Sequence, residues 1–62
     1  MKEDILELYN EVFDKNGSVK LCGREKCIDL IRALSNKYPE ENFGDTESGF
    51  MNVNVIKKYM GM

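Results

Sequence analysis

The shortness of the chain is the strongest constraint on its fold. A chain of 62 residues buries only about 60% of the surface that its unfolded form exposes, so one small core is the most it can build. The sequence therefore predicts a single small domain over residues 1–62. A ligand pocket usually needs a cavity of roughly 300 Å³ or more, which so small a chain rarely encloses. We therefore expect a protein that is not an enzyme.

Three segments carry apolar residues at the spacing of one helical face. The first covers about residues 2–15 and ends at Asn16-Gly17, because glycine readily adopts the left-handed conformation that closes a helix. The second covers about residues 24–37 and ends before Pro39, which cannot continue a helix. The third begins at Asn52 or Asn54 as N-cap and ends at Met60. The apolar faces consist of Ile5, Leu8, Tyr9, Val12 and Phe13, then Cys27, Leu30, Ile31, Leu34 and Tyr38, then Val53, Ile56, Tyr59 and Met60.

Two segments between these helices have other patterns. Residues 18–22 alternate polar and apolar, which predicts a short extended stretch with Val19 and Leu21 turned inward. Residues 40–49 are rich in turn formers and predict a loop. A short two-stranded antiparallel contact between residues 18–22 and 50–53 is compatible with this pattern. The predicted fold class is mainly α: a compact three-helix domain, in which a helix–loop–helix is followed by a C-terminal helix.

Composition argues against several kinds of site and location. The chain has no histidine and two cysteines, Cys22 and Cys27, so it lacks the ligands of a closed zinc site. Two cysteines are also too few for a disulfide-stabilised secreted scaffold. We therefore predict no cofactor, no membrane span and a cytoplasmic location. The net charge of −2 argues against nucleic-acid binding, which depends on many Lys and Arg side chains.

Oxygen-bearing residues recur at regular intervals after the first predicted helix. Counted from Asp14 as the first position, the third, fifth, seventh and twelfth positions are Asn16, Ser18, Lys20 (through its carbonyl) and Glu25. This spacing is similar to the calcium loop of EF-hand proteins. The resemblance covers this loop and the preceding helix, and it implies calcium binding. The sixth position holds Val19 where that family has glycine, so the module that the resemblance implies is a degenerate one.

The charges change sign from segment to segment along the chain. Residues 1–16 are net acidic, residues 17–38 are net basic, residues 39–50 carry only acids, and the remaining bases are Lys57 and Lys58. The simplest explanation is that neighbouring segments of opposite sign pack against each other within the fold. The alternative is a basic face that recognises an acidic partner, formed by Arg24, Lys26 and Arg32.

Protein binding is the function that this pattern favours. A domain with so small a core often gains stability by docking on a partner, and a homodimer is one form of such docking. Interfaces tend to use aromatic anchors, and the candidates are Phe43, Phe50 and Tyr59. The alternative, which we favour for Phe43 and Phe50, is that both close the core beneath the loop. We expect a small non-enzymatic regulator, inhibitor or adaptor that binds a protein partner of unknown identity, of the type that phage or mobile-element genes encode. A degenerate EF-hand-like calcium module is the alternative function, and a nucleic-acid-binding accessory protein is the third.

Overall fold

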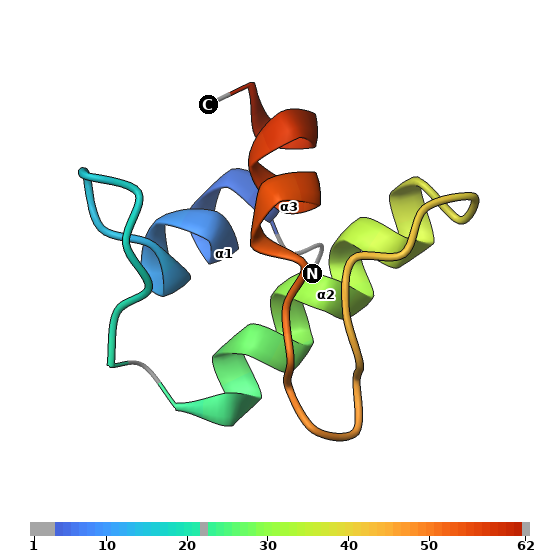
Figure 1. The fold of residues 1–62 in the computed structure, drawn as a ribbon, viewed down its shortest axis with the longest axis horizontal. Helices are drawn as coiled ribbons and strands as arrows, with labels where there is room; N and C mark the ends of the chain where they lie inside the picture. The colour runs from blue at the N-terminus through green and yellow to red at the C-terminus, as the bar shows by residue number, and fades with distance from the viewer. Residues whose placement is uncertain (1–3, 22, 62) are drawn as a thin grey trace.

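The fold is mainly α, as the sequence predicts. A computed structural model describes residues 4–21 and 23–61, and these residues form three helices (Figure 1). Helix α1 spans Ile5–Val12, helix α2 spans Arg24–Lys37 and helix α3 spans Val53–Met60. The molecule measures 27 × 25 × 24 Å, and buried side chains from all three helices belong to the same core cluster.

Helix α1 is shorter than the helix predicted for residues 2–15. It begins after Asp4, because the carboxylate of this residue accepts a hydrogen bond of 3.0 Å from the backbone N–H of Leu6 and so caps the first turn. It ends before Phe13, whose backbone is extended, with φ −115° and ψ 141°. The predicted continuation to residue 15 is therefore wrong, and residues 2 and 3 lie outside the described residues.

The predicted bounds of the other two helices are confirmed. Helix α2 follows Gly23 and ends one residue before Tyr38, because the next residue, Pro39, disfavours a helical conformation at Tyr38. Helix α3 follows Asn52, which is one of the two predicted N-caps. It ends at Met60 and is followed by Gly61, which has the left-handed φ of 77° that glycine adopts after a last helical turn.

Each segment between two helices folds back on itself. In the first hairpin, residues 13–19, Phe13 and Val19 form an antiparallel bridge, and in the second hairpin, residues 44–51, Gly44 and Met51 form another. For the described residues, the pairing of 18–22 with 50–53 that the sequence allowed is therefore wrong. A local reversal closes a much shorter loop, and so costs less chain entropy, than a contact between segments on either side of α2.

The core lies between α1 and α2 and is closed by α3 and the loop after α2. Tyr9 stacks on Phe13 with ring centroids 4.6 Å apart, and on the other side Phe43 meets the ring of Tyr59 edge-on at 5.1 Å. Phe43 is completely buried, as predicted by the alternative that it closes the core. The fully or nearly fully buried residues are Leu8, Tyr9, Val12, Phe13, Leu30, Ile31, Leu34, Phe43 and Ile56.

Candidate protein-binding surface

Large apolar side chains are exposed in both segments that connect the helices. Leu21 has a relative exposure of 108%, Phe50 of 66% and Val19 of 48%. The inward orientation predicted for Val19 and Leu21 is therefore wrong. Val19 is bridged to Phe13 through the backbone. The Phe13 side chain is buried in the core, whereas the Val19 side chain is exposed. The chain then continues along the surface towards α2.

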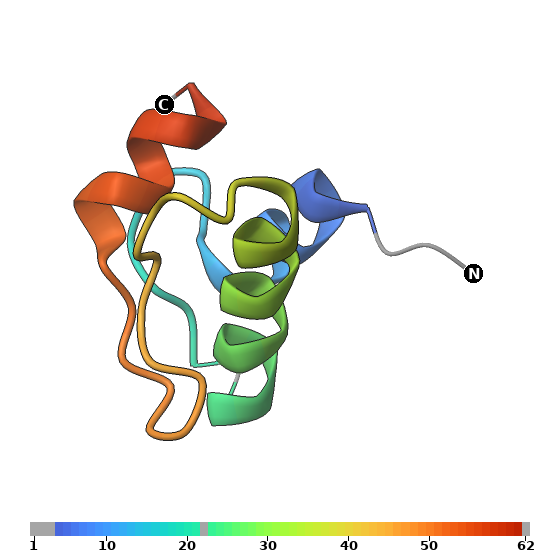
Figure 2. The same ribbon diagram turned by 90° about the vertical axis from the view of Figure 1, so that its right-hand side faces the viewer.

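A contact between Arg24 and Gly49 brings these two segments to the same end of the molecule. A Cβ atom added at Gly49 would lie 2.5 Å from the Cγ atom of Arg24, so the aliphatic stem of Arg24 lies against the tip of the second hairpin. Leu21 precedes Arg24 by three residues and Phe50 follows Gly49 directly. In both Figure 1 and Figure 2, residues 20–21 and the second hairpin lie at the N-terminal end of α2. We call the surface formed by Val19, Leu21, Arg24 and Phe50 the hairpin face.

A shallow hollow adjoins the hairpin face at Phe50. It has a volume of about 360 Å³ and is lined by residues 50–55. Phe50, Met51, Val53 and Val55 supply its apolar side chains, and none of its lining residues is charged. A larger surface hollow of about 950 Å³ lies between the start of α1 and α2, where charges of both signs line it. Only the smaller hollow is next to an exposed aromatic ring.

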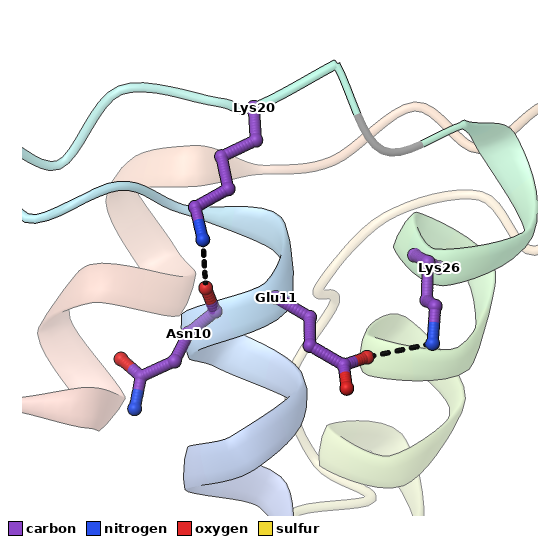
Figure 3. Close-up of polar contacts among 4 residues, drawn as sticks. All are labelled: Asn10, Glu11, Lys20 and Lys26. Atoms are coloured by element: carbon purple, nitrogen blue, oxygen red, sulfur yellow. Dashed lines mark hydrogen bonds and ion pairs between the residues drawn. The ribbon is translucent and has the colours of Figure 1, made fainter.

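The three basic residues predicted to form one face lie in three different surroundings. Arg24 packs against the second hairpin, and Arg32 lines the larger hollow together with Asp4 and Asp29. The Nζ atom of Lys26 lies 2.7 Å from a carboxylate oxygen of Glu11 in α1 (Figure 3). The structure therefore does not bring the three cations together, and only Arg24 belongs to the hairpin face.

The contacts of α1 agree with the simpler explanation of the charge pattern. Lys26 of the basic segment pairs with Glu11 of the acidic segment, and Lys20 donates a 2.7 Å hydrogen bond to the backbone carbonyl of Asn10 (Figure 3). Both lysines thus approach α1 from the neighbouring segment. The ion pair between Lys26 and Glu11 thus neutralises part of the alternating charge within the fold, as expected for neighbouring segments of opposite sign.

The three predicted aromatic anchors also differ in their surroundings. Phe43 is completely buried, so it cannot serve as a surface anchor. Tyr59 is half-buried against Phe43, and its hydroxyl donates a 2.8 Å hydrogen bond to a carboxylate oxygen of Glu41. This hydrogen bond to a carboxylate raises the pKa of Tyr59 above its ordinary value, and desolvation adds to the effect. Phe50 is 66% exposed, so the favoured prediction that it closes the core together with Phe43 is wrong, and of the three candidates it is the one that faces solvent.

The first three residues of the EF-hand-like spacing, Asp14, Asn16 and Ser18, lie in a tight turn. One carboxylate oxygen of Asp14 accepts hydrogen bonds of 2.9 Å from the backbone N–H groups of Asn16 and Ser18. The backbone N–H of Asp14 donates a 2.8 Å hydrogen bond to the carbonyl of Ser18. Glu25 lies outside this turn, in the first turn of α2. Among the described residues, no group of three or more His, Cys, Asp or Glu side chains is placed to hold a metal ion. Calcium binding stays a prediction.

The second hairpin is built in the same way as the first. Asp45 accepts a 2.8 Å hydrogen bond from the backbone N–H of Glu47 and a 3.1 Å bond from the hydroxyl of Ser48. These bonds lower the pKa of Asp45, the backbone bond most strongly. In each hairpin an aspartate follows the bridging residue, and a glycine with φ of 84°, Gly17 or Gly49, reverses the chain. The turns therefore hold Val19 and Phe50 on hydrogen-bonded backbone.

Two of the residues in the hairpin face, Val19 and Leu21, were not among the site residues predicted from the sequence. Alternation of polar and apolar residues shows which side chains share a side, but not which side meets the core. Length supplies no further signal, because five residues is an ordinary strand length.

The fold and the hairpin face define a class of protein rather than a particular one. The class is a small, mainly α, three-helix protein with exposed apolar side chains at one end. No family model matches the sequence, and no curated protein or solved structure is significantly similar to it. Within residues 4–21 and 23–61, none of the helices has the length and apolar character needed to span a membrane.

Proposed function

We propose that this chain is a small non-enzymatic regulator, inhibitor or adaptor that binds another protein through the hairpin face. The observation that carries the proposal is the exposure of Leu21 and Phe50 at the same end of a molecule whose other aromatic rings are buried or half-buried. Burial of one such side chain is worth roughly 1.5–3 kcal/mol. Leu21 and Phe50 stay exposed after folding, so a partner that buries them would gain this free energy on binding.

The composition of the hairpin face supports this proposal. Aromatic residues and arginine are enriched in protein interfaces, and they contribute a large share of the binding free energy. Here Phe50 borders an uncharged hollow of about 360 Å³, and Arg24 lies beside it against the second hairpin. An apolar side chain of the partner fits the hollow, while an acceptor on the partner fits the guanidinium.

The backbone around Phe50 is held by hydrogen bonds, which also favours binding. The Phe50 carbonyl accepts a 2.8 Å bond from the N–H of Asp45, and the Phe50 N–H donates a 3.2 Å bond to the hydroxyl of Ser48. An interface residue that is already ordered loses less conformational entropy when a partner binds. The proposal includes the cytoplasmic location that the cysteine content of the sequence predicts.

The test compares two exposed sites on the same molecule. The purified chain is immobilised and exposed to an extract of the cells that encode it, alongside a Leu21→Ser/Phe50→Ser variant and a Leu6→Ser variant. Leu6 is the matched control because it is 49% exposed but lies on α1, outside the hairpin face. We expect the wild type and Leu6→Ser to capture the same protein and the double variant to lose it at least about tenfold.

Two results would contradict the proposal. One is equal capture by all three chains, which would place the binding surface elsewhere. The other is the absence of any specifically captured protein when circular dichroism shows that the immobilised chain is folded. Helical circular dichroism of the double variant must match that of the wild type, since its two substitutions are at exposed positions where a change usually has little effect on stability.

A further inference from the structure

We propose that Asn16 is a self-modification site, at which the side-chain amide is converted to a carboxylate through a cyclic imide formed with the backbone nitrogen of Gly17. The two residues follow one another in the turn of the first hairpin, at the edge of the molecule in Figure 1, and Asn16 is exposed there. The inference does not depend on the proposed function, because it concerns only the chemistry of this turn. It assigns a covalent change to the hairpin that carries Val19 of the hairpin face.

The reaction needs only the turn and water. The backbone nitrogen of Gly17 loses its proton to solvent and bonds to the side-chain carbonyl carbon of Asn16, and the side-chain nitrogen takes up a proton and leaves as ammonia. Water then adds to one of the two carbonyl carbons of the ring and opens it. Opening at the side-chain carbon gives aspartate. Opening at the backbone carbon gives isoaspartate, in which the main chain runs through the former side chain.

The pairing of Asn16 with a following glycine favours ring closure. A side chain on the residue after an asparagine crowds the carbon that the backbone nitrogen attacks, and glycine has no such side chain. Within residues 4–21 and 23–61, the side-chain amide of Asn16 has no hydrogen-bond partner that would hold it away from this nitrogen. The two reacting atoms therefore meet whenever the backbone of the turn brings them together.

The other five asparagines serve as internal references, because none of them is followed by glycine. They are Asn10, Asn36, Asn42, Asn52 and Asn54. The first two lie within helices, where the next backbone nitrogen donates to a carbonyl one turn back. The other three are followed by phenylalanine or valine, whose side chains crowd the carbon under attack. The chemistry therefore singles out Asn16.

The hydrogen bonds of the first hairpin slow the reaction in the folded chain. The N–H of Gly17 donates a 3.0 Å bond to the carbonyl of Asp14, and the nitrogen must give up this bond before it loses its proton. One carboxylate oxygen of Asp14 also accepts bonds of 2.9 Å from the N–H groups of Asn16 and Ser18. The reaction therefore proceeds from an opened turn, and its rate depends on how often the turn opens.

Isoaspartate at position 16 changes the geometry of the turn. It inserts an additional carbon into the backbone between the N–H groups of residues 16 and 18, which now bond to the same oxygen of Asp14. That oxygen cannot keep both bonds at their present lengths. We expect the isoaspartyl form to weaken the bridge between Phe13 and Val19. Unchanged amide shifts of residues 13–19 in the separated isoaspartyl form would contradict this consequence.

The first test follows the folded chain as it ages in warm, mildly alkaline buffer. Samples are digested, mass spectrometry measures the mass gain of amide hydrolysis at each asparagine, and chromatography separates the aspartate and isoaspartate products. We expect Asn16 to react several times faster than any of the five reference asparagines and to give both products. Asn16→Gln is the control, because its longer side chain closes a larger ring much more slowly. Reaction of Asn16 no faster than the references, or equal reaction of Asn16→Gln at this position, overturns the inference.

The second test uses matched variants of the two hairpins. Asp14→Ala removes the oxygen that accepts the bonds from Asn16 and Ser18, whereas Asp45→Ala removes the corresponding aspartate of the second hairpin. We expect Asp14→Ala to speed the modification of Asn16 about tenfold, since two hydrogen bonds no longer hold the turn closed. Asp45→Ala is expected to leave the rate unchanged. Equal rates in Asp14→Ala and the wild type contradict control by the turn.

Folding of each variant is checked by circular dichroism. If Asp14→Ala is unfolded, the wild type in urea takes its place, because urea opens the same turn without a substitution. We then expect Asn16 to react at least about tenfold faster in urea than in the native chain. A native chain in which Asn16 reacts as fast as it does in urea contradicts protection by the turn.

Discussion

At the scale of single residues, the contrast between two phenylalanines connects folding with binding. Phe43 is completely buried against the rings of Tyr38 and Tyr59, whereas Phe50 is 66% exposed only a few residues further along. The two side chains therefore serve different purposes. One stabilises the core, and the other contributes little to stability and is available to a partner.

The same substitution at these two positions measures the difference. We expect Phe43→Leu to lower the free energy of unfolding by about 1–3 kcal/mol, because it leaves a gap in a packed core. Phe50→Leu is expected to change it by less than about 0.5 kcal/mol, as exposed substitutions usually do. Urea denaturation followed by circular dichroism checks both values. Equal losses at the two positions would mean that Phe50 is part of the core.

Gly49 is a second residue whose role can be measured against a matched position. Its φ of 84° disfavours other residues, and an added Cβ would also clash with the Arg24 stem. Gly23 has nearly the same φ, 88°, but a Cβ there would meet nothing within 4 Å. We expect Gly23→Ala to cost about 1–2 kcal/mol of stability from the backbone alone. Gly49→Ala is expected to cost about 1 kcal/mol more, from the clash.

Thermal denaturation of the two alanine variants gives the comparison. Equal costs for Gly23→Ala and Gly49→Ala would show that the second hairpin does not press on Arg24. The hairpin face would then lack the contact that joins the start of α2 to the second hairpin.

At the scale of the elements, the sequence predicts the helices better than the segments between them. The end of α2 is correct because Pro39 acts locally on the backbone of Tyr38. Helix α3 begins after Asn52 as predicted, although this side chain makes no cap hydrogen bond and its amide instead donates to the Asn42 carbonyl. The end of α1 is wrong because the chain reverses at Asp14, whose carboxylate organises the turn around it. Helical spacing of apolar residues carries no information about such side-chain bonds to the backbone.

The sequence also predicted some of the candidate binding residues and missed others. Phe50 was a candidate from its residue type, and it is exposed in the structure. Leu21 was missed, because alternation does not show which side of a short segment meets the core. The basic candidates are spread out because Arg24 and Lys26 point to opposite sides of α2, whereas Arg32 lies about two turns further along the helix than Arg24.

The bond from Tyr59 to Glu41 joins α3 to the loop after α2, and its contribution to stability depends on pH. The pKa of Tyr59 is raised in the folded protein. A group with a raised pKa contributes its full stabilisation below its unfolded pKa, which is about 10 for tyrosine, and loses it as the pH rises through the folded value. We expect Tyr59→Phe to be less stable than the wild type at pH 7.

Urea denaturation at a series of pH values checks this prediction. The difference between the wild type and Tyr59→Phe should shrink as the pH rises above about 10. Tyr38→Phe, which keeps the bond between Tyr59 and Glu41, serves as the control and should keep most of the pH dependence of the wild type, because that bond is the largest cause of the raised pKa of Tyr59. A difference that is the same at pH 7 and at high pH would contradict a role for this hydrogen bond.

The first hairpin also allows a direct test of calcium binding. The oxygen of Asp14 that accepts bonds from Asn16 and Ser18 already has partners in the turn. We therefore expect no saturable change in the backbone amide shifts of residues 14–25 when calcium is added to the millimolar range. Saturable shifts in that segment would favour the degenerate EF-hand-like module over the protein-binding regulator.

At the scale of the whole molecule, the large apolar side chains of the described residues mostly fill one core, and apart from Leu6 on α1 the exposed ones lie in the segments between the helices. Side chains from α1, α2, α3 and Phe43 fill the core, while Leu21 and Phe50 stay outside it near Arg24. A chain this short has few residues to spare once a core is built. Exposed apolar residues near one another are for this reason the feature that most strongly indicates a function in binding.

The most direct measurement is a map of the residues whose environment changes on binding. Amide spectra of the labelled chain are recorded before and after a captured partner is added. We predict changes concentrated in residues 18–24 and 45–55, with α1 from Ile5 to Glu11 unaffected. Changes centred on α1, or no changes in the hairpin segments while binding is observed, would contradict the assignment of the hairpin face as the binding surface.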